Sequence, residues 1–158
     1  MIPVKKNSSR LPGKNIKQFG DENLLVRKIR QVKNSGIADR IIVSSDSHEM
    51  LDIATTEAVE AILRPVYLAD ESRPLSEFFD YIANLITDGH LIWSCVTSPF
   101  FDEKLMVQAK EEYKKALTLG YDSLITVYDF KHYLMNVNGP LNYSLGAEHQ
   151  NSQDLNSI

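Results

Sequence analysis

The chain of 158 residues lacks several features that would place it at once in a class of proteins. Its only cysteine is Cys95, so an internal disulfide framework is excluded and a reducing compartment is favoured. No apolar run approaches membrane-spanning length, and the start does not resemble a signal peptide. We therefore expect a cytoplasmic protein with no membrane partner. The 43% apolar content is enough for one globular domain over residues 1–158.

Acidic residues are missing from the first 20 positions, although the whole chain has a formal charge of −4. Five of the 17 Lys and Arg residues lie there, which leaves 12 basic residues against 21 acidic ones elsewhere. These five are Lys5, Lys6, Arg10, Lys14 and Lys17. A focused basic patch on an acidic body indicates a small anionic ligand and argues against nucleic acid as a partner.

The basic residues lie in a stretch, 5–15, that is rich in Asn, Ser, Gly and Pro. Small residues let backbone N–H groups approach oxyanions, while Lys and Arg supply charge. The stretch is not a P-loop, because Gly13 is its only glycine and Asn15 follows Lys14. It also lacks the Gly-x-Gly-x-x-Gly dinucleotide fingerprint. On this pattern alone, a polyanion cradle and a solvated basic loop both stay open.

Hydrophobic periodicity predicts alternating strands and helices. The strands are expected at 2–4, 40–44, 61–63, 91–96 and 123–127, with 91–96 at the centre of the sheet. The helices are expected at 25–35, 47–59, 75–82 and 105–113, with Gly36, Asp46 and Asp102 as caps. This alternation favours an α/β fold with a mostly parallel sheet and helices on both faces. From residue 128 onward the pattern dissolves.

Ligands of such sheets bind beyond the carboxyl ends of the strands, and these ends carry the polar residues of interest. For Asp46, the roles of metal ligand, ribose ligand and helix cap all stay open. Arg64 is a fixed donor to a base or phosphate, or a surface arginine. Thr97 and Ser98 offer hydroxyls to a substrate, or are turn residues. Cys95 is interpreted as a small core residue, and the four histidines show no metal-ligand spacing.

Four motifs, in order, resemble the CMP-sugar-acid synthetases, most of all the acylneuraminate (CMP-sialic acid) cytidylyltransferases. They are Ile2-Pro3-Val4-Lys5-x-Asn7-Ser8-x-Arg10-Leu11-Pro12-Gly13-Lys14-Asn15, Arg40-Ile41-Ile42-Val43-Ser44-Ser45-Asp46, Arg64-Pro65-x-x-Leu68-Ala69 and Thr97-Ser98-Pro99. Ketodeoxyoctonate cytidylyltransferases are relatives of that family. The resemblance implies a Rossmann-like three-layer nucleotide-diphospho-sugar transferase fold, which we expect to be truncated at both ends here.

The resemblance also implies a nucleotidyl transfer assisted by Mg²⁺. The anomeric hydroxyl of a sialic-acid-like sugar acid would attack the α-phosphate of CTP, giving the CMP-sugar and pyrophosphate. By position, Arg10 and Lys14 would be the catalytic groups on the triphosphate. The nucleotide site would also include Lys5, Asn7, Ser8, Asn15 and Arg64. Thr97 and Ser98 would face the sugar acid, and the metal-binding aspartates are expected beyond Ile158.

Some residues depart from the family pattern. Lys5 stands where many sialic-acid enzymes have Arg, which keeps the charge but loses a bidentate fork. Cys95-Val96 replaces Gln-Pro, and Phe100-Phe101 replaces Leu-Arg, so the identity of the acceptor stays open. A nucleotide- or sugar-binding module without catalytic activity is the alternative. Residues 128–158 are expected to form a dimer-contact or extended arm, and the resemblance allows a homodimer.

Overall fold

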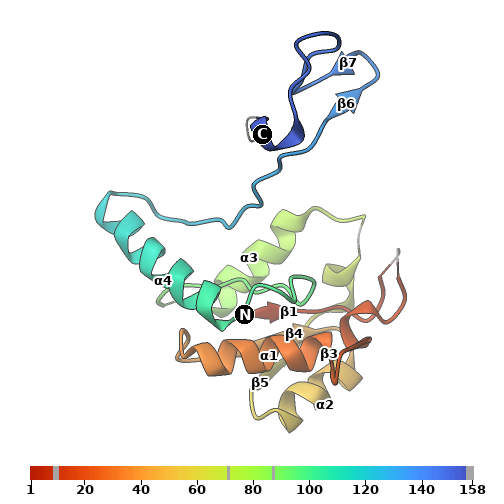
Figure 1. Cartoon of the computed structure of the whole chain (residues 1–158). Helices are drawn as coiled ribbons and strands as arrows, with labels where there is room; N and C mark the ends of the chain where they lie inside the picture. The colour runs from red at the N-terminus through yellow and green to blue at the C-terminus, as the bar shows by residue number, and fades with distance from the viewer. Residues whose placement is uncertain (9–10, 71, 87, 156–158) are drawn as a thin grey trace.

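The computed structural model describes residues 1–8, 11–70, 72–86 and 88–155. Its centre is a parallel three-stranded sheet in the order β1-β4-β5, formed by Ile2–Pro3, Ile42–Ser45 and Glu60–Leu63 (Figure 1). Ile2 pairs with Val43, and Val43 in turn with Ala61. All four residues of β4 are buried, as is typical of a middle strand covered on both faces. The predicted parallel sheet is therefore confirmed.

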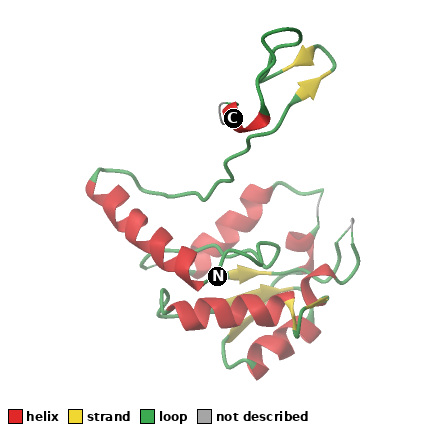
Figure 2. Ribbon diagram, viewed as in Figure 1, coloured by secondary structure: helices red, strands yellow, loops and turns green. Residues whose placement is uncertain are grey.

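In the described residues, four α-helices pack around the sheet, as Figure 2 shows. They are α1 Leu24–Ser35, α2 His48–Thr56, α3 Leu75–Leu85 and α4 Glu103–Thr118. Two antiparallel ribbons pair β2 Gln18–Phe19 with β3 Glu22–Asn23 and β6 Met135–Asn136 with β7 Gly139–Pro140. The described residues also contain the 3₁₀ turns η1 Lys14–Ile16, η2 Val66–Ala69 and η3 Ser152–Asp154.

The strand pleat divides the core into two layers. Ile2, Val4 and Val43 face one side, where they pack with residues of α1, α2 and the start of α4. Met1 and Ile42 face the other side and pack with Phe78 and Ile82 of α3. Helices on both faces of a parallel sheet make the three-layer α/β architecture that the alternation of elements predicts.

Local end signals explain where two helices begin and end. Asn23 caps α1 by accepting a hydrogen bond from the Val26 N–H at 2.9 Å. Gly36 ends that helix with φ 61°, the left-handed conformation that glycine adopts without strain. Asp102 caps α4 by accepting from the Leu105 N–H at 3.0 Å. The predictions for Gly36 and Asp102 are both confirmed.

The predicted cap of α2 is wrong. Ser47 occupies the N-cap position, and α2 ends at Thr56, three residues before the expected end. Asp46 instead lies in the turn before the cap, where its carboxylate accepts from the Lys6 backbone N–H at 2.9 Å. Asp46 bonds to Lys6 and does not cap α2, because the basic loop passes over the end of β4.

The strand predicted at 91–96 does not form, although this segment lies beside β1. Ser94 donates to the Met1 carbonyl and the Met1 nitrogen donates to the Ile92 carbonyl, each at 3.0 Å. Two residues further along, Pro3 occupies the next position that faces this segment, and proline has no N–H to donate. The ladder therefore stops after two bonds. Cys95 is exposed, so its interpretation as a core residue is also wrong.

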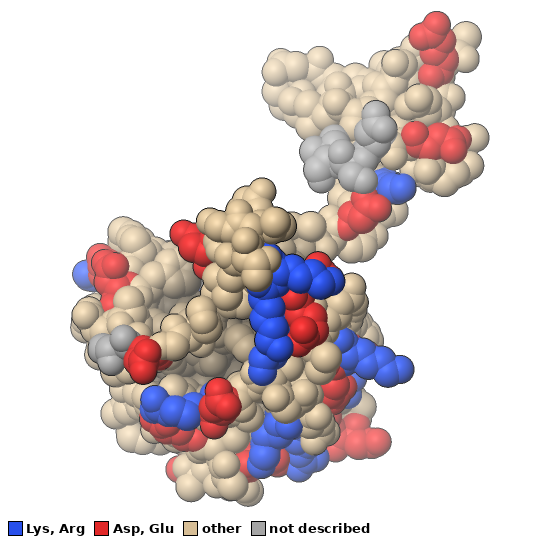
Figure 3. Space-filling view, turned by 90° about the vertical axis from the view of Figure 1, so that its left-hand side faces the viewer, with Lys and Arg blue, Asp and Glu red and all other residues tan. Residues whose placement is uncertain are grey.

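The strand predicted at 123–127 is irregular and exposed, with Ile125 and Val127 each 83% accessible. In the described part of the chain no other strand runs beside it, and a strand without a partner is not stable in water. Beyond it, residues 128–155 form an arm that stands away from the body and contains the β6–β7 ribbon (Figure 1). On the face shown in Figure 3, acidic and basic side chains are interspersed over the body.

Candidate functional site

A cavity of about 360 Å³ opens at the carboxyl edge of the sheet. It brings together side chains from four separate stretches of sequence, as expected where parallel strands end. Six of the predicted site residues line it: Lys5, Ser8, Lys14, Asn15, Arg64 and Thr97. Asn7 lines an adjoining cavity of about 480 Å³, which shares Lys5 and Ser8 with the first. The basic loop thus borders two neighbouring cavities.

The basic loop is held in place by its own backbone and by one buried amide. Gly13 adopts φ 64° and directs the chain into the η1 turn that presents Lys14. Asn15 is buried, and its side-chain amide donates to the Lys5 carbonyl at 2.9 Å. This bond joins the two ends of the loop, so Lys5 and Lys14 are presented to the same cavity. The side chain of Asn15 therefore has a structural partner of its own.

Arg64 is only 4% exposed, although it lines the cavity. Its guanidinium donates to the Val4 carbonyl at 2.8 Å, lies 3.9 Å from the Asp46 carboxylate and stacks 4.5 Å from the centre of the Phe78 ring. Burial lowers the pKa of this guanidinium, and the nearby Asp46 opposes that change. The alternative of a surface arginine is excluded. Arg64 links the end of β1 to β5 beneath the loop.

Asp46 belongs to this arrangement, although its position after β4 suggested a cap. Its carboxylate receives the Lys6 N–H and faces Arg64, and it lines the adjoining cavity. A carboxylate with these two partners orders the basic loop from below. Only the carboxyl-end position of Asp46 hinted at such a role, because its partners lie far away in the sequence.

Aromatic side chains form the apolar wall of the cavity. Trp93 meets Phe78 and Phe79 edge-to-face, with ring centres 5.3 and 5.2 Å apart. Phe78, Trp93, Leu68 and Leu75 line the cavity together. Neither Trp93 nor Phe78 is among the site residues predicted from the sequence. An apolar wall beside cations and amides is typical of pockets for nucleotides and other small ligands.

The remaining predicted residues are placed less directly. Thr97 is exposed at the cavity, beside Cys95 and Val96. Ser98 is absent from both described cavity linings, and its carbonyl instead accepts from the Lys28 amine at 2.9 Å. The catalytic role predicted for Arg10 lies outside the described residues.

These features define a class: an α/β protein with a basic loop and an aromatic-walled pocket at the carboxyl edge of a parallel sheet. Within that class, the chain belongs to the cytidylyltransferase family, because the family model described as cytidylyltransferase matches residues 1–143. The predicted CMP-sugar-acid synthetase resemblance is thereby confirmed.

Two curated relatives show the range of the family. A pseudaminic acid cytidylyltransferase of Campylobacter jejuni is 25% identical over 157 residues, covering 84% of this chain and 68% of the relative. An N-acylneuraminate cytidylyltransferase of Escherichia coli is 29% identical over 115 residues, covering 72% of this chain and 27% of the relative. The substrates in these names differ, so the family is shown and the acceptor is not.

Among solved structures, CMP:2-keto-3-deoxy-manno-octonic acid synthetase complexed with CTP is similar, with a TM-score of 0.61 at 13% identity. The similarity covers 72% of this chain and 46% of that one. It shows that the fold is shared, and it confirms the predicted fold class. The chain thus matches about half the length of this structural relative.

Proposed function

We propose that the protein is a cytidylyltransferase that transfers CMP from CTP to the anomeric hydroxyl of a sialic-acid-like sugar acid in the cytoplasm. The observation that carries the proposal is the cavity at the sheet edge, which Lys5, Ser8, Lys14 and Thr97 line together. Cations and small polar groups suit a triphosphate, and the Thr97 hydroxyl is a polar group that a second substrate can contact.

In the proposed reaction, the anomeric oxygen attacks the α-phosphorus and the bond to the pyrophosphate oxygen breaks. The hydroxyl proton leaves to solvent, and the negative charge passes to pyrophosphate. Catalysis of such transfers is mostly positioning and charge stabilisation. Lys14 supports the departing charge, together with Arg10 by its place in the motif. Asn15 holds the Lys5 carbonyl and Arg64 holds the Val4 carbonyl. In the proposal, both residues border the space for the cytidine part of CTP.

Mg²⁺ belongs to the same proposal. Among the described residues there is no group of three His, Cys, Asp or Glu side chains placed to hold a metal ion. This part of the chain therefore offers no protein cage, and we derive no step through the ion. Mg²⁺ is often carried by substrate phosphates and water with one or two carboxylates. We expect pyrophosphate release to stop when EDTA removes the metal.

The decisive experiment measures pyrophosphate release from CTP, with pseudaminic acid, N-acetylneuraminic acid and ketodeoxyoctonate as separate acceptors. Release with at least one acid, and none with ATP in place of CTP, is the expected result. Calorimetric titration with CTP and ATP runs alongside. CTP binding without turnover would replace the proposal by the binding module without catalysis, and equal or absent binding of both nucleotides would reject the cytidine pocket.

We propose that the arm and the segment that leads into it mediate a homodimer. Its support is the row of exposed apolar side chains between the body and the β6–β7 ribbon, among them Tyr121, Ile125, Val127 and Tyr128. Exposed apolar runs of this kind are covered in stable assemblies.

Among the helices that the structure describes, we find none with the length and apolar character of a membrane span.

A further inference from the structure

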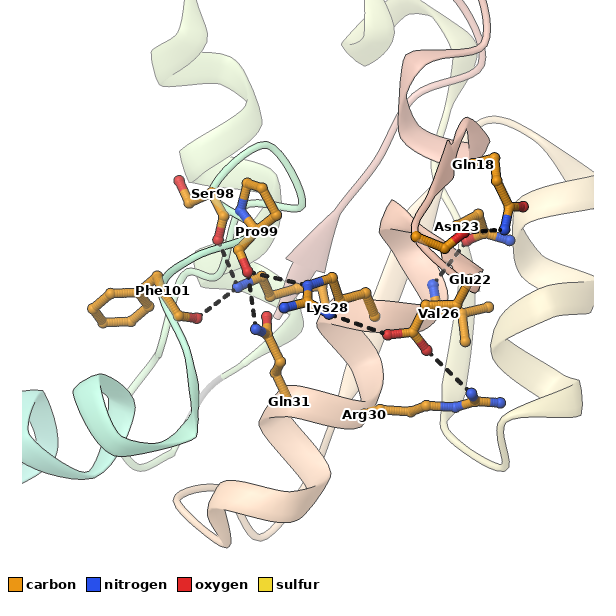
Figure 4. Close-up of polar contacts among 12 residues, drawn as sticks. Gln18, Glu22, Asn23, Val26, Lys28, Arg30, Gln31, Ser98, Pro99 and Phe101 are labelled. Carbon is orange, nitrogen blue, oxygen red and sulfur yellow. Dashed lines mark hydrogen bonds and ion pairs between the residues drawn. The ribbon is translucent and has the colours of Figure 1, made fainter.

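Helix α1 holds the turn at residues 98–101. This turn directly follows Cys95, Val96 and Thr97, which line the cavity of about 360 Å³. We call these three residues the Thr97 wall and this cavity the main cavity. Four hydrogen bonds from three side chains reach backbone carbonyls there. Lys28 donates to the carbonyls of Ser98 and Phe101, both at 2.9 Å. Gln31 and Arg27 donate to the Pro99 carbonyl at 3.0 and 3.2 Å. Figure 4 shows the Lys28 amine and the Gln31 amide pointing from the helix toward this turn. We call Arg27, Lys28 and Gln31 the α1 clamp.

The burial of Lys28 makes its two hydrogen bonds to the turn necessary. Lys28 is fully buried, and its amine lies 5.9 Å from the centre of the Phe101 ring. A buried amine is costly unless its hydrogens find acceptors, and the two carbonyls supply them. Replacing it by an apolar side chain would remove this donor from the Phe101 carbonyl and leave the Ser98 carbonyl with the Phe101 N–H alone. The position therefore ties the helix to the turn more strongly than surface contacts would.

The clamped turn is coupled directly to the cavity wall. Ser98, whose carbonyl is held, is the neighbour of Thr97, which lines the cavity. Two turn bonds stiffen the connection, from the Ser98 N–H to the Cys95 carbonyl and from the Phe101 N–H to the Ser98 carbonyl. A shift of the turn therefore moves Thr97 and Val96 with it.

The part of the cavity lining that belongs to the basic loop is held by different residues. There, Asn15 fixes the Lys5 carbonyl and Arg64 fixes the Val4 carbonyl. The clamp makes neither contact. Loss of the clamp should consequently disturb the Thr97 side and leave the basic loop in place.

We propose that Arg27, Lys28 and Gln31 are positioning residues that hold the Thr97 wall in the geometry that receives the sugar acid. They act through the backbone of residues 98–101 and do not touch the acceptor. This inference rests on the proposed function and adds the residues that define its acceptor side. The Phe101 carbonyl and ring take part in the same contact, where the family resemblance implies an arginine.

The test compares Lys28→Met and Gln31→Met with Arg30→Met. Gln31→Met is the gentler change, because the Gln31 Oε1 atom is buried without a partner in the described structure and methionine removes that cost along with the bond. Arg30→Met removes a charge from the same helix but leaves the turn alone, since Arg30 pairs with Glu22 and Glu57.

Trp93 is the only tryptophan and lines the cavity, so its fluorescence reports binding. The measured quantities are the Kd of CTP and, with CTP and Mg²⁺ present, the KM of each of the three sugar acids. We expect the acceptor KM to rise about tenfold in Lys28→Met and about threefold in Gln31→Met. The Kd of CTP should stay within about twofold of the wild-type value in both variants, and Arg30→Met should match the wild type.

The outcomes separate the two proposals. A wild-type protein that neither binds nor uses any of the acids removes the proposed function, and the clamp role with it. A wild-type protein that uses an acid while both methionine variants match Arg30→Met overturns the clamp alone. Equal losses of CTP and acceptor affinity would show a merely structural role and would also overturn it. If Lys28→Met does not fold, Gln31→Met decides by the same criteria.

Discussion

Lys14 and Arg64 are both cations of the main cavity, but their surroundings give them different tasks. Lys14 is half-buried at the start of η1 and lines the cavity beside Ser8. Arg64 is buried, and its Nη2 group donates to the Val4 carbonyl. A cation at the mouth of a pocket suits a charged ligand, whereas a buried one holds the protein together.

Lys14→Ala tests the triphosphate site. Loss of one charge-assisted contact should weaken CTP binding about 10- to 100-fold, because such contacts contribute roughly 1.5–3 kcal/mol. Calorimetry measures the affinity. Lys17→Ala is the matched control, since Lys17 is exposed directly after η1 and lines neither described cavity. Equal affinity of both variants and the wild type would reject the role of Lys14.

Arg64→Leu should lower the free energy of unfolding by about 2–4 kcal/mol, because it leaves the Val4 carbonyl without its donor and the mostly buried Asp46 carboxylate without its cation. Urea denaturation measures the change. Arg73→Leu is the control: it removes the surface pair with Glu77, which contributes about 0.5 kcal/mol, and an exposed contact with the Tyr67 ring of about the same size. Similar effects of the two substitutions would contradict the structural role of Arg64.

Lys28 makes stability depend on pH. Burial lowers the pKa of its amine from about 10.5 to about 8, so between these values the unfolded chain binds more protons than the folded one. Folding stability from this group therefore rises as the pH increases from about 8 to about 10.5. At pH 9.5 the wild type should have gained about 2 kcal/mol over Lys28→Met relative to pH 7.

The measurement is urea denaturation of both proteins at pH 7, 8.5 and 9.5. Other lysines and tyrosines titrate in both chains, so the difference between the two isolates Lys28. A stability difference that stays constant over this range would show that the amine titrates at its ordinary pKa.

At the scale of elements, helix ends depend on single side chains that accept from the first turn. Asp102→Ala should destabilise α4 by about 1 kcal/mol, because the Leu105 N–H loses its acceptor. Ser47→Ala at α2 should change little, since the Ser47 side chain makes no capping bond. Helical circular dichroism during thermal unfolding compares the two. A larger loss from Ser47→Ala would contradict this assignment of the caps.

Segments 91–96 and 123–127 show what decides whether a strand-like sequence forms a strand. Both carry apolar, β-branched patterns. The first lies beside β1 but meets Pro3, which cannot donate, and the second has no strand beside it in the described part of the chain. A segment with strand-forming residues becomes a strand only where a neighbouring strand offers backbone donors and acceptors in register.

At the scale of the whole molecule, the arm separates one exposed apolar surface from the body (Figure 1). We expect sedimentation velocity to show dimers at micromolar concentration, because Ile125 and Val127 are each 83% exposed and an apolar surface of this kind is covered on association. Ile125→Asp combined with Val127→Asp should yield monomers. Ser123→Asp combined with Thr126→Asp adds the same charge at exposed polar positions and should leave the dimer intact. A monomeric wild type would reject the proposal.

The features that could be read from residue order are local ones. Gly36 and Asp102 end and begin helices through neighbours one turn away, and the basic loop between β1 and η1 is visible as a run of cations without acids. The ordered motifs also indicated the family. Such signals can be recognised in the sequence because the interacting groups lie within a few residues of one another.

Burial and distant partners were decided by packing. Asp46 has its partner 40 residues away at Lys6, Arg64 its partner 60 residues away at Val4, and Lys28 its partner 70 residues away at Ser98. Each is a polar residue whose sequence neighbourhood suggests a cap or a surface position. Only the tertiary structure brings the acceptor within 3 Å and removes the water, and both are needed before a charged side chain prefers one role.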